Sequence, residues 1–276
     1  MRRTRLVPLV VLALVALDAP QASSVTLTAS ALLAKLPVKA ESNAGYDRSL
    51  FRHWIDADRD GCDTRAEVLM AESLVATTRN SYCTVQTGKW VSFVDGRTWT
   101  SASDLEIDHL VALSEAWGSG ARSWSPLQRQ RYANDLGFVW SLNAITSSVN
   151  SAKSDYDPAQ WLPPKVGVRC LYAIRWMEVK YRWRLSIDAT EKTALQRLLS
   201  GTCGQKVITL PPLGPKDTGT TVSSTSGNCD PAYPTVCIPP PPPDLDCSDI
   251  PYRNFTVLPP DPHHFDGNGD GIGCSG

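Results

Sequence analysis

The sequence predicts an α+β fold, because helical and strand patterns occur together without the repetition that builds a parallel sheet. Apolar residues recur at helical spacing in 64–77 and 170–185, so both segments are expected to form helices. Residues 89–101 have the pattern of a β-hairpin around an Asp95-Gly96 two-residue turn, and 104–113 the pattern of a short strand. No strand–helix–strand unit recurs, so a mixed α+β arrangement is favoured over an alternating one.

Capping signals predict where two further helices begin. Ser125 can cap a helix whose first position suits Pro126, so a helix is expected to begin there. A later helix is expected to begin with Asp188 and Glu191 as a capping pair and to stop at Gly201.

Composition divides the chain into four segments. Residues 1–24 place three arginines before an apolar run too short to span a bilayer, which is the layout of a secretory signal. After a poorly specified lead-in, residues 46–203 are expected to form the main domain. Residues 204–228, rich in Pro, Gly, Ser and Thr, predict a flexible linker, and 229–276 a small acidic module. No other stretch suits a membrane anchor, so the chain is expected to be exported.

The eight cysteines are an even number, and in an exported chain they predict four disulfides rather than a thiol enzyme or a zinc site. Spacing alone does not determine their connectivity. Pairing of nearest neighbours is favoured, because each pair brackets one plausible structural unit: Cys62 with Cys83, Cys170 with Cys203, Cys229 with Cys237, and Cys247 with Cys274.

The net charge of −1 conceals a strong asymmetry along the chain. Residues 121–184 contain ten Lys or Arg and four acidic residues, whereas 205–276 contain three and eight. A basic middle suits a polyanionic partner such as nucleic acid, and an acidic end suits cations. A basic face that is merely solvated is the alternative.

Asp108 and His109 are the first candidates for chemistry, because phosphodiester hydrolysis needs a base and a cation that screens the phosphate. Alone, an Asp-His pair on a strand is more typical of structural residues. Asn150 and Lys153, one helical turn apart, add an oxygen ligand and a positive charge. Neighbours on a strand point to opposite faces, so we expect the strand to bend or end at Asp108 and His109.

With these residues in view, the chain resembles HNH endonucleases with the ββα-metal motif. Asp108-His109 followed by Asn150-x-x-Lys153-Ser154-Asp155 is similar to the secreted actinobacterial members of the GmrSD C-terminal type, and to the HNH domain of RNA-guided CRISPR nucleases. The resemblance extends over about 46–203 through further blocks: Trp54-x-Asp56-x-Asp58-x-Asp60-Gly61-Cys62-Asp63-Thr64-Arg65, Ala133-Asn134-Asp135, Asp157-Pro158-x-x-Trp161-x-Pro163-Pro164 and Cys170-x-Tyr172.

The resemblance implies a ββα-metal core inside a mainly helical domain and a role for each motif residue. It implies His109 as general base, Asp108 and Asn150 as ligands of one divalent cation, Mg²⁺ or Mn²⁺, and Lys153 near the scissile phosphate.

The middle asparagine of the motif has two candidates. Asn134 and Asn143 are both candidates for this catalytic position, and Asn134 is preferred. Ser141 occupies the position where this asparagine would be expected.

Two acidic loops are candidate Ca²⁺ sites. The first has the EF-hand spacing of Asp56, Asp58, Asp60 and Glu67 around Gly61. In 229–276, the second places oxygen ligands at alternate positions and resembles an Excalibur calcium-binding-like module, whose usual last acid is here Ser275; its ligands would be Asp266, Asn268 and Asp270.

The sequence therefore predicts a secreted, metal-dependent endonuclease acting on DNA, with RNA an open second substrate, and with low sequence specificity. The rival hypothesis is a calcium-binding cell-surface or wall-associated protein with a degenerate nuclease-like core. A toxin-type nuclease shares the chemistry but lacks a recognisable delivery domain. The oligomeric state and a place in the cell wall are left open by the sequence.

Overall fold

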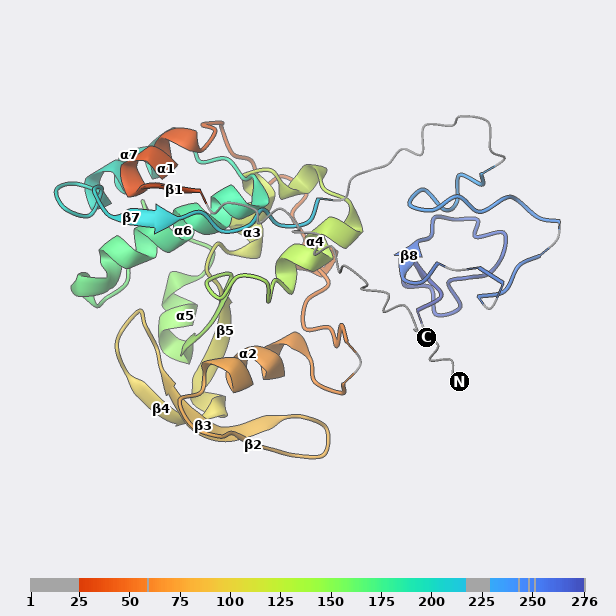
Figure 1. Cartoon of the computed structure of the whole chain (residues 1–276), viewed down its shortest axis with the longest axis horizontal. Helices are drawn as coiled ribbons and strands as arrows, with labels where there is room; N and C mark the ends of the chain where they lie inside the picture. Colours follow the sequence, from red (N-terminus) through yellow and green to blue (C-terminus); the bar gives the residue numbers. More distant parts are fainter. Residues whose placement is uncertain are drawn as a thin grey trace, which may run out of the picture.

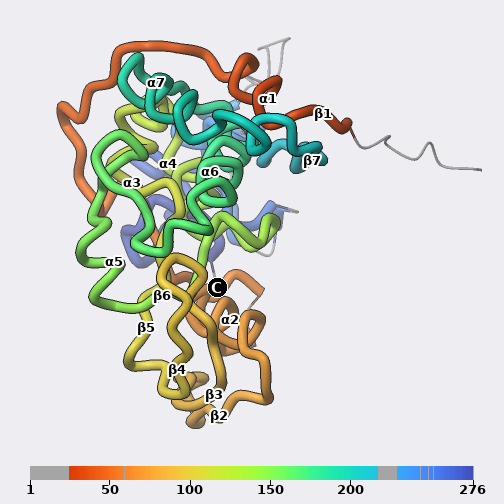
Figure 2. The backbone as a smooth tube through the Cα atoms, turned by 90° about the vertical axis from the view of Figure 1, so that its left-hand side faces the viewer, coloured from red at the N-terminus to blue at the C-terminus, as the bar shows by residue number. Residues whose placement is uncertain are grey.

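The computed structural model describes residues 25–216 and 229–275, except Arg59, Pro243, Ser248 and Pro251. Figures 1 and 2 show a main body with a mainly helical upper half and a lower half that holds most of the strands, and a separate C-terminal module beside it. The expected secretory signal, 1–24, lies outside the described residues. In the part of the chain that is described, no helix has both the length and the apolar character needed to cross a membrane.

The upper half is built from helices that pack around one long central helix. This helix, α6 (Arg169–Trp183), is flanked by α1 (Ala29–Lys35) and α7 (Ala189–Leu198). Beside them, β1 (Thr26–Thr28) pairs antiparallel with β7 (Val207–Thr209), as Figure 1 shows. The apolar core runs along α6, with large side chains such as Trp176 and Trp183 almost completely buried.

The packed body is therefore longer at both ends than the expected domain, 46–203. The lead-in forms β1 and α1 and contributes Leu32 and Leu33 to the core. The first part of the expected linker forms β7, and the Arg182 side chain donates to the Pro212 carbonyl. The composition of the expected linker, rich in Pro and Gly, does not predict that its first part is ordered. The order comes from the pairing of β7 with β1, which is distant in the sequence. Residues 217–228 of the linker lie outside the described part.

Between the halves lies a ββα unit. β5 (Leu105–His109) pairs antiparallel with β6 (Leu142–Thr146), and α5 (Ser147–Lys153) follows β6 directly. The pairing is regular through Asp108–Asn143 and His109–Leu142. The strand does not bend at these residues, but β5 ends at His109, which is one of the two expected outcomes.

The lower half packs α2 (Thr64–Glu72) against a three-stranded sheet of β2 (Thr78–Arg79), β3 (Val85–Val91) and β4 (Thr98–Ser101). The helix begins where expected, with the Asp63 carboxylate accepting from the Ala66 amide at 2.8 Å. It ends before the expected position of Thr77.

Two local predictions in this half were wrong for physical reasons. Leu74 and Val75 are exposed by 65% and 50% and have no core to pack on, so the helix stops before them. The hairpin turn is longer than two residues, because the ladder ends at Val91 and Thr98 and the loop is closed by a bond from the Ser92 amide to the Arg97 carbonyl. The mixture of helices with small antiparallel sheets confirms the α+β class.

Short helices join these parts. α3 (Leu113–Gly118) follows β5, and α4 (Pro126–Ala133) begins as predicted, with the Ser125 side chain accepting from the Gln128 amide at 3.1 Å. Among the described residues, the body also contains four single-turn 3-10 helices: η1 (Arg48–Leu50), η2 (Ala102–Asp104), η3 (Ala121–Ser123) and η4 (Val166–Val168).

A closed cluster of charges lies inside the upper half. The Lys180 ammonium, fully buried, contacts the carboxylates of Glu41 at 3.4 Å, Glu191 at 2.9 Å and Glu115. The Glu191 carboxylate also accepts from the Trp176 indole. Asp188 caps α7 as predicted, but Glu191 does not complete the capping pair, because its side chain is drawn into this cluster.

The C-terminal module has its own small core and a two-stranded sheet of β8 (Phe255–Thr256) and β9 (Ile272–Gly273). It lies near α4 of the main body (Figure 1), and Arg52 pairs with Asp270 at 3.3 Å. The predicted pairing of all eight cysteines is confirmed: Cys62–Cys83, Cys170–Cys203, Cys229–Cys237 and Cys247–Cys274.

Candidate active site

A cavity of about 320 Å³ opens where β5 ends, against α5. Asp108 and His109 come from the end of the strand and Asn150 from the helix, so the ββα unit brings three residues distant in the sequence to one hollow. The cavity can therefore offer a base and two oxygen ligands to one reacting group. Its other lining residues are Tyr46, Arg48, Ile107, Ala112, Leu113, Ser114, Ser151, Ser154 and Asp155.

His109 is held on several sides. Its Nε2 lies 2.9 Å from the Ala133 carbonyl oxygen, which can only accept, so Nε2 carries the proton and Nδ1 the lone pair. The ring stacks on Trp54 with centroids 5.4 Å apart, and on Tyr132 at 6.4 Å. Burial lowers the pKa of His109 to about 3, so the imidazole is neutral near pH 7.

Asp108 uses only one of its two carboxylate oxygens within the protein. Its Oδ1 accepts from the Lys153 ammonium at 2.8 Å, whereas Oδ2 is buried without a hydrogen-bond partner among the described residues. Burial raises the pKa of Asp108, and the charge of Lys153 opposes this rise. A buried carboxylate oxygen without a partner is costly unless a ligand satisfies it.

The donor set fits a hard divalent cation. Asp108 and Asn150 both line the cavity, and Asp108 has an oxygen without a partner among the described residues. Carboxylate and amide oxygens are the ligands that Mg²⁺ and Mn²⁺ prefer. A magnesium ion is usually held by one or two protein oxygens and keeps several waters, so this small set suffices.

Lys153 lies elsewhere than the resemblance implies. Its side chain is fully buried beneath the cavity, and its ammonium bonds the Asp108 carboxylate and, at 3.1 Å, the His109 carbonyl oxygen. It does not line the cavity. Lys153 therefore contacts Asp108 from the protein interior and does not extend into the cavity toward a phosphate.

Asn134 also lies outside the cavity lining. Its side-chain oxygen accepts from the Ile55 amide at 3.2 Å and from the Thr64 hydroxyl at 2.9 Å, and its amide donates to the Arg52 carbonyl at 2.7 Å. Asn134 directly follows Ala133 at the end of α4. Its side chain thus ties the segment that carries Trp54 to the end of this helix and acts as a structural brace.

Asn143, the other candidate for the middle asparagine, is buried on β6 opposite Asp108. Its side chain donates to the Trp140 carbonyl at 3.0 Å. Ser141, two residues earlier in the chain, is also buried and donates to the Asp135 carboxylate at 2.6 Å. Neither side chain lines the cavity.

The basic stretch 121–184 does not translate into a basic surface of the same strength. Several of its cations are buried and paired inside the fold: Arg129, Lys153, Lys180 and Arg182. Arg182, for example, bonds the Asp135 carboxylate at 2.7 Å. Charge counting alone could not distinguish internal cations from surface cations.

Arg48 is the site residue that the sequence analysis missed. Among the residues that line the cavity, it is the only lysine or arginine. Burial raises the pKa of the Tyr46 hydroxyl, and the charge of the nearby Arg48 opposes part of this rise. The available signal was the spacing Tyr46-x-Arg48-x-x-Phe51, in which two aromatic anchors bracket an arginine.

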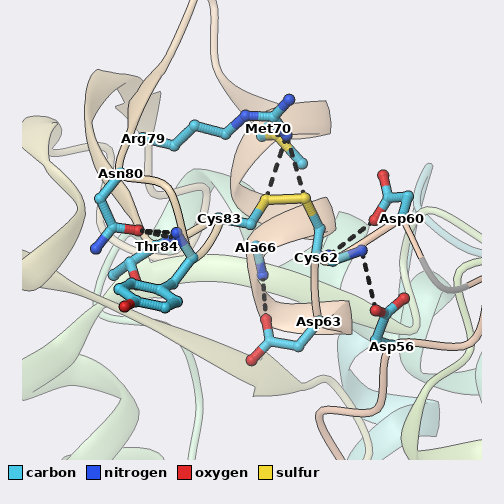
Figure 3. Close-up of a disulfide and its surroundings, with 12 residues drawn as sticks. Asp56, Asp60, Cys62, Asp63, Ala66, Met70, Arg79, Asn80, Cys83 and Thr84 are labelled. Carbon is cyan, nitrogen blue, oxygen red and sulfur yellow. Dashed lines mark hydrogen bonds between the residues drawn. A yellow bond between two sulfur atoms is a disulfide. The ribbon is translucent and has the colours of Figure 1, made fainter.

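The first acidic loop has the hydrogen bonds of a preformed cation loop. The Asp56 carboxylate accepts from the Gly61 amide at 3.0 Å, and Gly61 has a φ of +89°. The carboxylates of Asp56, Asp58 and Asp60 approach one another closely. Glu67, entering from α2, has a buried Oε2 without a partner among the described residues. Figure 3 shows the loop beside the Cys62–Cys83 disulfide that anchors it.

The second acidic loop repeats this geometry in the C-terminal module. The Asp266 carboxylate accepts from the Gly271 amide at 2.6 Å, and Gly271 has a φ of +79°. Asn268 and Asp270 accept from amides two residues further along the chain, at 3.2 and 2.9 Å.

Most of the residues that line this cavity lie in a region that matches a known family, whereas Tyr46 and Arg48 lie before that region. The model of the family described as GmrSD restriction endonucleases, C-terminal domain, matches residues 52–198. An uncharacterized secreted protein of Arthroderma benhamiae (strain ATCC MYA-4681 / CBS 112371) is 44% identical over 177 residues, which is 64% of this chain and 85% of that protein. No solved structure matches the chain significantly.

Proposed function

Because the chain belongs to the family of the GmrSD restriction endonucleases, C-terminal domain, we propose that it is a secreted, metal-dependent HNH-type endonuclease. Its proposed substrate is DNA, cut with low sequence specificity, and RNA is a second substrate to be tested. The observation that carries this proposal is the convergence of His109, Asp108 and Asn150 on one cavity. The four disulfides and the secreted relative support export.

In the proposed reaction, His109 accepts a proton from the water that attacks phosphorus. The Ala133 carbonyl fixes the proton on Nε2, which leaves the Nδ1 lone pair as the base. Stacking on Trp54 limits rotation of the imidazole ring. The base is therefore held in one orientation before substrate binds.

Asp108 and Asn150 would hold the divalent cation, Mg²⁺ or Mn²⁺. When bound, this cation supplies a Lewis acid that screens the negative charge developing on the phosphate. Lys153 orients Asp108 and compensates its charge from the buried side, at 2.8 Å. Asn134 braces the segment around Trp54, which supports the position of His109 indirectly.

The test is cleavage of plasmid DNA and of RNA by the purified mature chain, with Mg²⁺ or Mn²⁺ and with chelator. We expect metal-dependent cleavage that His109→Ala lowers by about 100-fold or more, because a positioned base contributes factors of this size. His264→Ala, an exposed histidine of the C-terminal module, is the matched control and should cleave like wild type. Equal cleavage by wild type and His109→Ala contradicts the assignment of the base.

The two acidic loops are proposed as Ca²⁺ sites, the second in an Excalibur-like module. The support is the turn geometry and, in the first loop, the free oxygen of Glu67, whose pKa is raised by burial and then by Asp58 and Asp60. Calcium should raise the melting temperature, because it binds the folded state. Asp58→Asn should reduce this shift more than Asp266→Asn, and a melting temperature that ignores Ca²⁺ counts against both sites.

A further inference from the structure

Hydrolysis of a phosphodiester places additional negative charge on the phosphate in the transition state, and this charge needs a nearby cationic donor besides the metal. Lys153, the expected donor, is buried and bonded to Asp108 and to the His109 carbonyl. It cannot reach the cavity without breaking a buried ion pair. The donor must therefore come from another part of the fold.

Arg48 has the position that such a donor requires. It lines the same cavity as Asp108 and His109, and its side chain is exposed at the mouth. No carboxylate of the described residues lies within ion-pair distance of its guanidinium. Tyr46, whose pKa the Arg48 charge lowers against the effect of burial, lines the cavity too. A guanidinium with free N–H groups can bind two phosphate oxygens at once.

Several contacts hold the backbone that carries Arg48. The Asp47 carboxylate caps the 3-10 turn by accepting from the Ser49 amide at 2.8 Å. Phe51, fully buried, anchors the end of the turn, with its ring 6.3 Å from that of Trp117. The Arg129 side chain also donates to the Leu50 carbonyl at 3.2 Å. The guanidinium therefore projects from a fixed base.

We propose that Arg48 is a catalytic residue that binds the non-bridging oxygens of the scissile phosphate, in the place expected for Lys153. This inference rests on the proposed nuclease function and deepens it. Arg48 reaches the cavity from the segment before the first acidic loop. The proposed site therefore combines the ββα unit with a guanidinium from outside that unit.

The test compares cleavage of a duplex oligonucleotide by Arg48→Ala, Arg48→Lys and the matched control Arg197→Ala, an exposed arginine of α7. We expect Arg48→Ala to lower kcat/KM by about 100-fold, as removal of one transition-state donor does. Arg48→Lys should recover part of this loss, because it restores the charge without the planar fork. Arg197→Ala should cleave like wild type, and all three variants should melt at the wild-type temperature.

A second readout separates phosphate contact from a structural role. In the His109→Ala background, duplex binding is measured by fluorescence anisotropy at several salt concentrations, with and without Arg48→Ala. Loss of one phosphate contact should reduce the slope of log affinity against log salt by about one. If Arg48→Ala leaves the slope unchanged and its kcat/KM equals that of the Arg197→Ala control, the inference about Arg48 is overturned while the nuclease function stands. A wild-type chain that cleaves nothing with any metal overturns the nuclease function and this inference with it.

Discussion

Lys180 in the upper half and Lys153 below the cavity are both fully buried, but their carboxylate partners are arranged differently. Lys180 contacts three glutamates, and none of these has a buried oxygen without a partner among the described residues. Lys153 pairs with Asp108 alone, and the second oxygen of Asp108 has no partner there. The first cluster is closed and the second is open toward the cavity.

This difference distinguishes a structural ion cluster from a functional one. Buried charge is tolerated where every polar atom is satisfied, so a closed cluster has nothing left to offer a ligand. An open pair retains a desolvated oxygen that a cation can satisfy. The geometric grouping of Glu41, Glu115 and Glu191 could suggest a metal site, but Lys180 already occupies its centre.

The largest expected effect is the loss of stability in Lys180→Met. This change leaves three carboxylates in the upper core without their cation, and we expect the free energy of unfolding to fall by about 5 kcal/mol. Urea unfolding at pH 7 with intact disulfides measures it. A loss of less than about 1 kcal/mol would break the comparison, because the cluster would then not depend on its lysine.

Lys153→Met should cost less stability but affect catalysis. The expected loss of stability is about 3 kcal/mol, because Asp108 keeps access to the cavity when its buried partner is removed. Nuclease activity should fall about 10- to 100-fold, as for other residues that orient a metal ligand. Urea unfolding and plasmid cleavage over a range of metal concentrations measure the two effects. Full activity in this variant would mean that Asp108 does not need its partner.

The smallest expected effect is a pH-dependent gain in Glu41→Gln. Burial raises the pKa of Glu41 to about 8 against the opposing charge of Lys180, so the native state holds this proton more tightly than the unfolded chain. The resulting stability is present below pH 4.5 and is lost as the pH rises through 8. Glutamine stays neutral, so the variant should match wild type at pH 5 and exceed it by about 1 kcal/mol at pH 8.5.

Unfolding curves at the two pH values check this prediction, with the exposed Glu106→Gln as control. The control should follow wild type at both values. A Glu41→Gln variant that is less stable than wild type at pH 8.5 would mean that the charged carboxylate is needed to hold Lys180.

Much of the fold follows from local sequence signals. The Ser125-Pro126 start of α4 and the Asp63 and Asp188 caps depend on a few neighbouring residues, and these were predictable. The pairing of β1 with β7 was not, because it joins segments from opposite ends of the body. Local propensity contains no information on such a contact.

The candidate site was likewise predictable only as far as local sequence signals reach. The motif spacing brought Asp108, His109 and Asn150 to one cavity, because a strand end and the helix that packs on it are close in every ββα unit. The position of a long side chain does not follow from the motif spacing. Lys153 turns inward and Arg48 reaches in from a segment outside the motif, and both outcomes depend on tertiary packing.

The bond between His109 and the Ala133 carbonyl has a consequence for the timing of the reaction. A carbonyl has no proton to give, so the imidazole cannot exchange its tautomer while this contact persists. In the proposed reaction the proton on Nε2 therefore stays in place, and only the proton at Nδ1 is taken up and released in each turnover. The substrate would then bind next to a base whose tautomer is already set. Mutations that loosen the end of α4 at Ala133 would slow the chemical step without changing any reacting atom.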